Sequence, residues 1–485
     1  MSKLVKYKNI LVLSLGIFLT YSAFNSSQNL QSLVMQEDGF GQMGYHILAT
    51  LYLFMGLGSI FSTAIINKFG SRKCMMMGGL GNAQWIFTTI LATEHENKLN
   101  QQIIDEPPIL ITVLIFVSTI INGFTVGILW SCANNYVARN SDPDHKGTGF
   151  GIFWTFYMMS QISGNLIASY TLEKLNQTSF FLIMGSVALV GTSSFYLISN
   201  PSETTHKMAE QPQQELEFER QVRERRFSEL TESTNSSQII RDPKDEQSNF
   251  KSDVKLVLHL IIDNRMRYVM LQICWTGISI AVYTGLLVPT IVETLKTSNE
   301  QEQFKQSMLA MVALGVGEIS GAVIQGKLVD KYGTKNVCVL NMVLILVATI
   351  FVLNYLYLDD YSVFAFIMTF VWGFQDSAVS IHLNTILSSE FDDNPGPFSL
   401  DSLIEATMVF CFQMIQSFVV SWSAHFIYIS FVGIAGILMC ATTLLFEFRN
   451  DKIKGAKQNH QNEGIALTRM MKLELKVQKL HEEES

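Results

Sequence analysis

Two long apolar runs in the second half of the chain are joined by GKLVDKYGTK (residues 326–335), and two in the first half are joined by NKFGSR (residues 67–72). A glycine lets two helix ends approach closely, an acid suits the N-terminus of a neighbouring helix, and basic residues suit a membrane surface. The repeat predicts a duplicated helical unit. The plainer alternative is a basic loop with a turn glycine in each half. The candidate gating-loop residues are Gly70, Arg72, Gly326, Asp330, Lys331, Gly333 and Lys335.

The composition indicates that lipid is the main solvent of this chain. Hydrophobic residues make up 48% of the 485 residues and charged residues only 16%, whereas a soluble domain usually has about 25% charged residues. A shortage of charge combined with long apolar runs is typical of membrane proteins. The formal net charge of −8 argues against nucleic acid as a partner. The lipid bilayer is therefore the first expected partner, and the sequence predicts neither a metal site nor a cofactor.

The apolar runs predict about twelve transmembrane helices. A span needs about 20 mostly apolar residues, and the backbone within lipid must pair internally, so each span is expected to be an α-helix. The first run follows several lysines and resembles a secretory signal, but it is too long for a signal core and is interpreted as a retained helix. The expected spans are residues 9–33, 44–66, 74–93, 109–137, 148–171, 179–199, 266–292, 306–328, 336–357, 361–388, 398–423 and 426–447.

These spans predict an all-α membrane protein of two pseudo-symmetric six-helix bundles. Residues 1–199 are the expected N-terminal bundle, and residues 264–447 are the expected C-terminal bundle. Residues 200–263 are rich in Glu, Gln, Arg and Ser, so they are expected to be a cytoplasmic, mostly disordered linker. Within it, Glu215 to Leu230 can form a charged helix. Residues 448–485 are the expected cytoplasmic tail.

Lysine and arginine in the short loops predict the orientation in the membrane. Under the positive-inside rule, both termini and both repeated loops lie in the cytoplasm. The acidic loop from Glu390 to Asn394 breaks this trend. The charge pattern does not distinguish the plasma membrane from an internal membrane.

Several ionisable residues lie within the predicted spans, where charge is costly and usually faces a cavity or a partner. Asp376 is interpreted equally well as a proton or cation site and as a structural acceptor. Glu318 lies among glycines that favour close helix packing, and His382 is more typical of a packed helix residue. Asp401 and Glu405 share one helix face and are interpreted as an interfacial pair.

Amide side chains form a polar stripe on the first predicted helix. Asn25, Gln28 and Asn29 share one face by their i, i+3 and i+4 spacing, and such a stripe either lines a cavity or joins two helices. We favour the cavity. The candidate cavity or coupling residues are Asp376, Glu318, Asn25, Gln28, Asn29, Asn122, Gln161, Asn165 and His382.

Five motifs together carry a resemblance to a known family. They are AFNSSQNLQSL (residues 23–33), GILW (127–130), GFGIFW (149–154) with SQ (160–161) and GNL (164–166), GVGEI (315–319) and GFQDS (373–377). Together they resemble the unc-ninety-three-like family, including its facilitator-domain-containing members, a branch of the major facilitator superfamily. The resemblance covers about residues 8–447 without the linker. Two departures are Asn67, where the general signature of the superfamily has an aspartate, and Gln375, where a glycine is commoner. The resemblance implies a two-bundle transporter fold, with substrates mostly undefined.

The sequence is compatible with two kinds of function. The first is a secondary carrier of a small solute or cation, which needs a hydrated central cavity with convergent polar groups. The second, which the family resemblance implies, is a non-transporting accessory protein that regulates a channel of the potassium type or escorts another membrane protein. No phosphate loop, nucleophile elbow or triad predicts an enzyme.

Two modification sites are predicted outside the spans. Asn176 begins an Asn-Gln-Thr acceptor for N-glycosylation in a short outer loop. Ser228 follows Arg225-Arg226-Phe227 in the expected linker, a context that favours phosphorylation.

Overall fold

The computed structural model describes most of the two predicted bundles, and the regular elements within the described residues are helical, with no strand. Asn176, Ser228, the segment from Glu215 to Leu230 and residues 449–485 lie outside the described residues, so their predictions stay predictions. The described residues are 7–37, 40, 43–99, 109–142, 145–174, 177–198, 250–296, 300–391, 395–416, 418–419 and 421–448.

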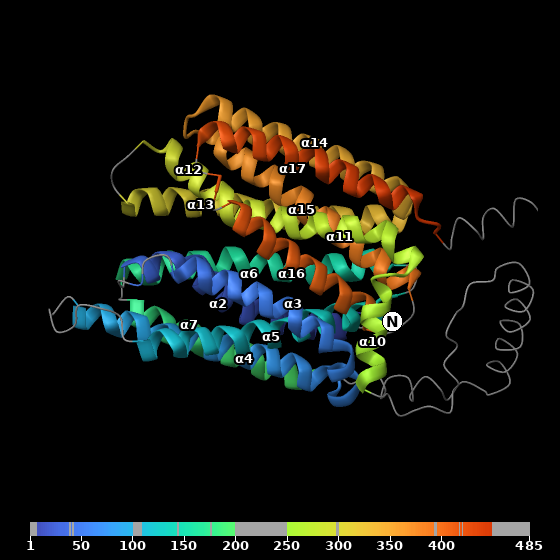
Figure 1. Ribbon diagram of the computed structural model, residues 1–485, viewed down its shortest axis with the longest axis horizontal. Helices are drawn as coiled ribbons and strands as arrows, with labels where there is room; N and C mark the ends of the chain where they lie inside the picture. Colours follow the sequence, from blue (N-terminus) through green and yellow to red (C-terminus); the bar gives the residue numbers. More distant parts are fainter. Residues whose placement is uncertain are drawn as a thin grey trace, which may run out of the picture.

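The first half of the chain folds into one bundle, which occupies the lower part of Figure 1. Its helices α3 and α5 pack together, α2 packs on α6 and α7, and α4 packs on α5 and α7. Because each helix contacts several others, the apolar residues cluster in one continuous core. The helices are α2 (Lys8–Glu37), α3 (Met43–Phe69), α4 (Ser71–Leu99), α5 (Ile109–Asn140), α6 (Lys146–Lys174) and α7 (Gln177–Ser194), followed by the short 3-10 helix η1 (Phe195–Leu197).

The second half repeats this arrangement above it in Figure 1. Helix α13 packs on α15, α14 on α15 and α17, and α11 on α16 and α17. The halves meet where α6 contacts α13 and where α3 contacts α16. The predicted all-α fold is confirmed. The helices are α11 (Asn264–Val282), the π-helix η2 (Tyr283–Leu287), α12 (Val288–Thr294), α13 (Glu300–Tyr332), α14 (Thr334–Leu358), α15 (Val363–Glu390), α16 (Gly396–Gln416), α17 (Trp422–Thr442) and the 3-10 helix η3 (Thr443–Leu445).

Ten helical segments in the described part of the chain are long and apolar enough to cross a membrane. The predicted spans 74–93 and 148–171 correspond to α4 and α6, which are not among the ten although each has 29 residues. Both helices contact other helices on several sides, and α6 also faces the second half. A helix surrounded by protein need not be apolar on every face, so hydropathy alone underestimates these two spans.

Glycines bring α3 and α5 into backbone contact. A Cβ atom added at Gly127 would lie 2.1 Å from the Met55 carbonyl oxygen, and one at Gly123 would lie 2.4 Å from the Leu51 carbonyl oxygen. Two small residues four positions apart on one helix are a common way to pack membrane helices closely. The crossing of α3 and α5 therefore depends on the absence of side chains at these positions.

Replacing Gly127 with alanine is expected to lower the free energy of unfolding by about 1–3 kcal/mol, because the new methyl group would force the two helix backbones apart. Gly56 is the matched control, since a Cβ atom there would meet its nearest neighbour at 3.6 Å, an ordinary contact distance. Thermal unfolding of the purified variants in detergent measures the difference. Equal melting temperatures for Gly127→Ala and Gly56→Ala would contradict this account of the crossing.

The two repeated loops mark one end of the molecule, called here the motif end. Gly70 and Gly333 adopt matching backbone angles, with φ of 78° and 79°, in the left-handed region that glycine tolerates best. Arg72 donates from Nε and Nη2 to the Ile198 carbonyl oxygen, at 3.0 and 2.8 Å. Lys331 lies over the Tyr332 ring, and Lys335 is exposed.

Hydrogen bonds join the two halves at the motif end. Asp330, at the end of α13, accepts from the backbone N–H groups of Gly147 and Thr148 at the start of α6, both at 2.9 Å. Gly326 permits this approach, because a Cβ atom there would lie 2.5 Å from the Gly147 carbonyl oxygen. Ser399 of α16 also contacts the Ser62 hydroxyl, at 2.6 Å between the oxygens. The motif end is therefore closed by contacts on two sides of the molecule.

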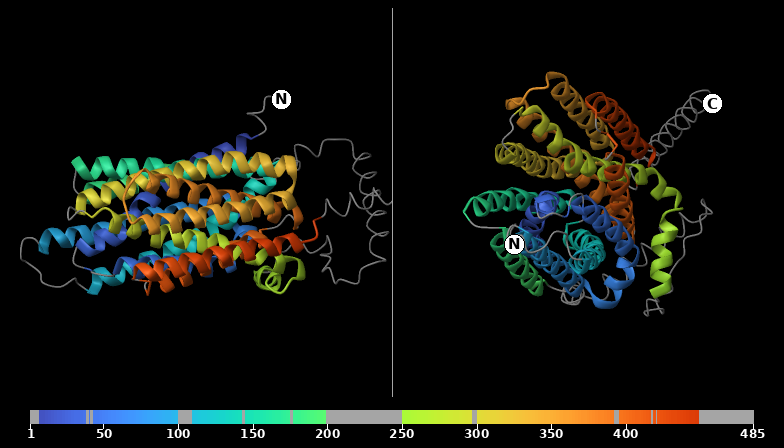
Figure 2. Two further views of the ribbon diagram at one scale, coloured as in Figure 1. Left: turned by 90° about the horizontal axis from the view of Figure 1, so that it is seen from above. Right: turned by 60° about the vertical axis from the view of Figure 1, so that its left-hand side comes forward.

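Residues 250–260 of the predicted linker form a helix, which the prediction of a mostly disordered segment did not specify. Helix α10 (Phe250–Leu260) packs on α3 and on α16. Figure 1 shows it crossing the motif end, steeply inclined to the long helices, and Figure 2 shows it outside them. Its Phe250 ring stacks on Phe61 at a centroid distance of 6.2 Å, and its buried Asp253 accepts from Asn67 Nδ2 at 3.1 Å. The linker was judged by its overall polar composition, and this average hides a short amphipathic helix at its end.

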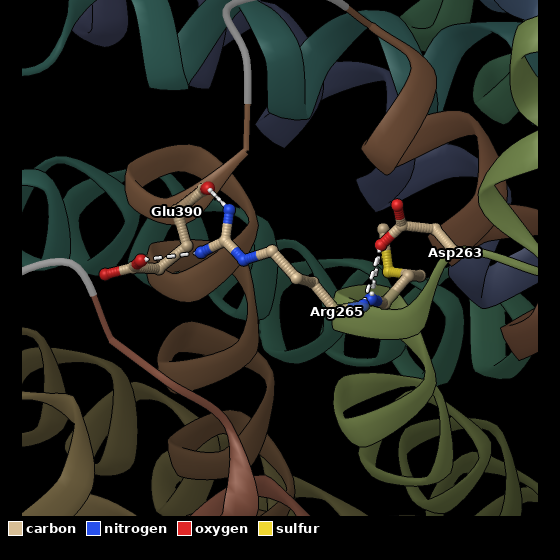
Figure 3. Close-up of polar contacts among 4 residues, drawn as sticks. Asp263, Arg265 and Glu390 are labelled. Carbon is tan, nitrogen blue, oxygen red and sulfur yellow. Dashed lines mark hydrogen bonds and ion pairs between the residues drawn. The ribbon is translucent and has the colours of Figure 1, made fainter. Parts of the chain in front are cut away.

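Glu390, which begins the acidic loop that opposes the charge trend, is paired with a cation. Figure 3 shows Arg265, in the first turn of α11, reaching the end of α15. Its Nη1 donates to the Glu390 carbonyl oxygen at 3.0 Å, and its Nη2 lies 3.2 Å from the Glu390 carboxylate. Asp263 caps the same turn by accepting from Arg265 N at 2.8 Å. A cation at a helix C-terminus is stabilising, so Arg265 offsets the acidic loop.

Candidate functional site

A cavity of about 70 Å³ lies between the two halves, enough for several water molecules. Helices α2, α3, α5 and α6 line it from the first half, and α11, η2, α15 and α16 line it from the second. The part of the lining that the structure describes includes no lysine or arginine. Its polar lining residues are Tyr21, Asn25, Gln28, Tyr52, Trp130, Asn134, Trp154, Tyr157, Thr276, Tyr283, Asp376, Ser380, Asn384, Asp401, Ser402 and Glu405.

Three carboxyl groups of the second half face this cavity. Asp376 lies on α15, and Asp401 and Glu405 lie one turn apart on α16. The interpretation of Asp401 and Glu405 as an interfacial pair is therefore wrong. Asp401 looks interfacial because it follows the helix start by only five residues, but Ser131 reaches the Phe398 carbonyl oxygen and covers that helix start with the first half.

Buried acceptors at the acidic wall lack donors. The Oδ1 atoms of Asp376, Asp401 and Asn384 are inaccessible and have no hydrogen-bond partner among the described residues. An unpaired buried polar atom costs about 1–3 kcal/mol. The buried carboxyl groups are therefore costly in this conformation, and a bound proton, a water molecule or a nearby cation would lower that cost.

Aromatic side chains form the opposite wall. Trp130 of α5 packs edge-to-face on Tyr157 of α6, with ring centroids 4.7 Å apart, and on Tyr21 of α2 at 5.2 Å. Trp154 adds a further edge-to-face contact with Tyr157 at 5.4 Å. These rings come from α2, α5 and α6, and no local spacing could predict that rings on different helices meet. The tryptophans of the GILW and GFGIFW motifs were the available signals.

The polar stripe of the first helix contributes both to the cavity and to helix packing. Asn25 lines the cavity and donates to Ser160 Oγ at 3.1 Å. Gln28 lines it as well and donates to the Tyr52 hydroxyl at 3.2 Å. Asn29 belongs to α2, but its side chain lies outside the described residues. Asn25 and Gln28 thus each do both things that were expected of the stripe: they line the cavity, and they form a hydrogen bond to a neighbouring helix.

Glu318 lies behind the cavity, in the seam between α13 and α15. A Cβ atom at Gly373 would be 3.1 Å from Glu318 Cγ, and one at Gly317 would be 2.0 Å from the Phe370 carbonyl oxygen. The close packing predicted from the flanking glycines is present. Glu318 is fully buried, and neither carboxyl oxygen has a hydrogen-bond partner within the described part of the chain.

His382 belongs to a buried hydrogen-bond network of the second half. Its Nε2 lies 2.8 Å from the Thr334 carbonyl oxygen, and its Nδ1 lies 3.0 Å from the amide nitrogens of Gln272 and Asn341. These distances fit a neutral ring that donates from Nε2 and accepts at Nδ1. Gln325 extends the network by donating to Asn341 Oδ1 at 2.7 Å. His382 therefore joins helices and does not line the cavity.

The remaining candidates also lie outside the cavity. Asn122 is fully buried in the first bundle, and its amide has no hydrogen-bond partner among the residues that the structure describes. Asn165 is buried on α6, and Gln161 is half-buried on the same helix. Of the nine candidate residues, Asp376, Asn25 and Gln28 line the cavity.

The geometry defines a class of protein: a polytopic helical membrane protein with two similar bundles and a polar cavity at their interface. The sequence model of the Major Facilitator Superfamily matches residues 13–400, and the chain belongs to that superfamily.

Relatives with unc-93-like names match at low identity. The UNC93-like protein MFSD11 of Xenopus tropicalis is 22% identical over 425 residues, covering 81% of this chain and 85% of the relative. The protein unc-93 homolog A of Mus musculus is 27% identical over 187 residues, or 35% of each chain. The resemblance predicted from the motifs is therefore confirmed.

Solved structures share the fold. The proton:xylose symporter XylE matches with a TM-score of 0.63 at 14% identity, covering 91% of this chain and 95% of that one. A bacterial homologue of the iron transporter ferroportin, in an outward-facing state, matches with a TM-score of 0.64 at 12% identity, covering 91% and 99%. At these identities the likeness concerns the fold alone.

Proposed function

We propose that this protein is a secondary transporter that carries a small solute or cation by alternating access. The observation that carries this proposal is the cavity between the two halves, with buried polar groups of both halves converging on it. Transporters of this architecture place the substrate site near the bilayer midplane, at the interface between structural repeats. A purely structural scaffold has no need for unpaired acceptors at such a place.

The closed motif end supplies the gate. Access from that end requires α13 to leave α6, which breaks the bonds of Asp330 to Gly147 and Thr148. It also requires α16 to leave α3, which separates Ser399 from Ser62. We place the motif end in the cytoplasm, because Lys68, Arg72 and other basic residues gather there.

The carboxyl groups supply the coupling chemistry. An isolated ionised carboxylate is unfavourable at membrane depth, so Asp376 is stable either with a bound proton or with a bound cation. Alternation between these two forms links solute binding to a proton or cation gradient. Asn25 and Gln28 line the same cavity from the first half and provide neutral hydrogen-bonding groups.

Transport is expected in liposomes that contain the purified protein. Uptake of labelled sugars, amino acids and organic amines is measured under an imposed pH or potassium gradient, together with proton movement reported by a trapped pH dye. At least one solute should enter faster than in protein-free liposomes. If monodisperse protein moves neither protons nor any member of this panel, the transporter proposal fails and the accessory function remains.

A further inference from the structure

The two walls of the central cavity differ in chemistry. The first half contributes aromatic rings, chiefly Tyr21, Trp130 and Tyr157, while the second half contributes Asp376 and Glu405. Aromatic rings present a negative face to a ligand, and carboxyl groups offer negative charge or acceptor oxygens. Both walls therefore favour positive charge, and the described lining holds no lysine or arginine that would neutralise it.

The aromatic wall is built as one unit. Trp130 contacts Tyr21, Tyr157 and Trp154, with ring centroids 5.2, 4.7 and 6.1 Å apart. The contacts with the two tyrosines are edge-to-face, at 61° and 79°. Rings held against one another in this way keep fixed orientations, so they form a rigid surface of the kind that binds quaternary and methylated ammonium groups.

The acidic wall contains acceptors with no assigned donor. Asp376 Oδ1 and Asp401 Oδ1 are buried at the cavity without hydrogen-bond partners among the described residues. Asp376 and Asp401 are 3% and 5% exposed, so solvent outside the cavity does not reach them. An ammonium group satisfies such acceptors by charge, and a protonated amine also donates hydrogen bonds to them.

An inorganic ion would use only part of this site. A hydrated metal ion gains little from the indole and phenol rings, because metals of the hard class prefer oxygen ligands. Within the described ranges, no three His, Cys, Asp or Glu side chains are grouped to hold a metal. An organic cation contacts both walls at once, with its alkyl groups on the rings and its charge beside the carboxyl groups.

We infer that the central cavity binds a small organic cation, either a quaternary ammonium or a protonated alkylamine, between the aromatic wall of the first half and the carboxyl groups of the second. This inference rests on the proposed transport function for its biological meaning, but binding itself is testable without transport. The cavity of about 70 Å³ limits the ligand in this closed conformation to a small head group.

The test measures equilibrium binding of labelled choline to the purified full-length protein in detergent. Choline has a neutral isostere, 3,3-dimethylbutan-1-ol, in which carbon replaces the charged nitrogen. Choline is expected to bind saturably, and an equal concentration of the isostere should not displace it. Because the two molecules share their shape, this comparison isolates the contribution of the charge.

Substitutions in each wall measure how much that wall contributes to the affinity for choline. Trp130→Leu is expected to weaken choline binding by about 2- to 30-fold, the range of cation–π interactions, whereas Trp130→Phe should retain most of the affinity. Glu405→Gln should weaken binding while leaving the fold intact. Tyr357→Leu and Asp359→Asn are matched controls, because Tyr357, in the last turn of α14, is 80% exposed and Asp359, which follows that helix, is also exposed, away from the cavity. Thermal unfolding of each variant confirms that it is folded.

The outcomes separate this inference from the proposed function. Absence of choline binding in folded protein that transports another solute overturns the inference and leaves the transporter proposal standing. Choline binding without flux of choline, protons or any member of the solute panel supports the site and overturns the transporter proposal. Displacement of choline by the neutral isostere, or binding of manganese(II) that depends on Glu405 but not on Trp130, also overturns the inference.

Discussion

Replacing Asp376 with asparagine is expected to abolish gradient-driven flux while leaving the amount of folded protein unchanged. The side chain keeps its shape and an acceptor oxygen, but it can no longer gain or lose a proton. Since Asp376 lines the cavity and its Oδ1 has no hydrogen-bond partner among the described residues, little of the fold depends on its charge. Flux should fall to the level of protein-free liposomes.

The measurement compares the pH dependence of flux in wild type and the Asn variant between about pH 5 and 8, the range relevant to a physiological proton gradient. Asp376→Leu is the companion variant, because it removes hydrogen bonding as well as charge. If Asp376 is only a structural acceptor, the Leu variant should lower expression and the Asn variant should transport normally. Asp359→Asn, which removes an exposed carboxylate, controls for the loss of one charge. Wild-type flux in Asp376→Asn at every pH would eliminate the coupling role.

Replacing Asp330 with asparagine is expected to open the motif end. The aspartate accepts from the backbone N–H groups of both Gly147 and Thr148, and its charge faces the N-terminus of α6. Asparagine retains one acceptor oxygen but loses the charge. A loss of about 1–2 kcal/mol, expected when the acceptor of these hydrogen bonds loses its charge at a helix N-terminus, multiplies the population of the open form by about 5- to 30-fold.

A cysteine at position 399 reports on this opening, because Ser399 is fully buried between α16 and α3. The rate at which a polar maleimide labels Ser399→Cys should rise by the same 5- to 30-fold when Asp330→Asn is added. Labelling of the native cysteines, measured in the parent protein without the new cysteine, is subtracted. Asp359→Asn serves again as the neutral control. Identical labelling rates with and without Asp330→Asn would show that this cap does not hold the gate closed.

The fold could be predicted from sequence because membrane helices are specified locally. Each apolar run has to satisfy its own backbone hydrogen bonds, so its length and boundaries follow from consecutive residues. The predicted span 109–137 and the observed helix α5 (Ile109–Asn140) illustrate this. The repeated loops then predicted the duplication without any knowledge of how the helices pack.

The site could be predicted only in part, because a cavity is specified by residues that meet across helices. Asp376 was identifiable as a charge within a long apolar run. Asp401 and Glu405 were misplaced because their distance from the helix start resembles that of interfacial residues, whereas α3 and α5 cover this region in the structure. His382 carried a plausible functional residue type, yet Gln272 and Asn341, distant in sequence, complete its hydrogen bonds.

Helix α10 explains why the two repeated loops are not interchangeable. It has a partner in each half, and through Asp253 it already brings a carboxylate to Asn67. An aspartate at position 67, as the general signature has, would set two like charges about 3 Å apart. The asparagine is thus the complement of a helix that has no counterpart among the described residues of the second half. The two halves have matching helices, but different contacts hold their repeated loops in place. The free energy needed to open the motif end therefore differs between its two sides.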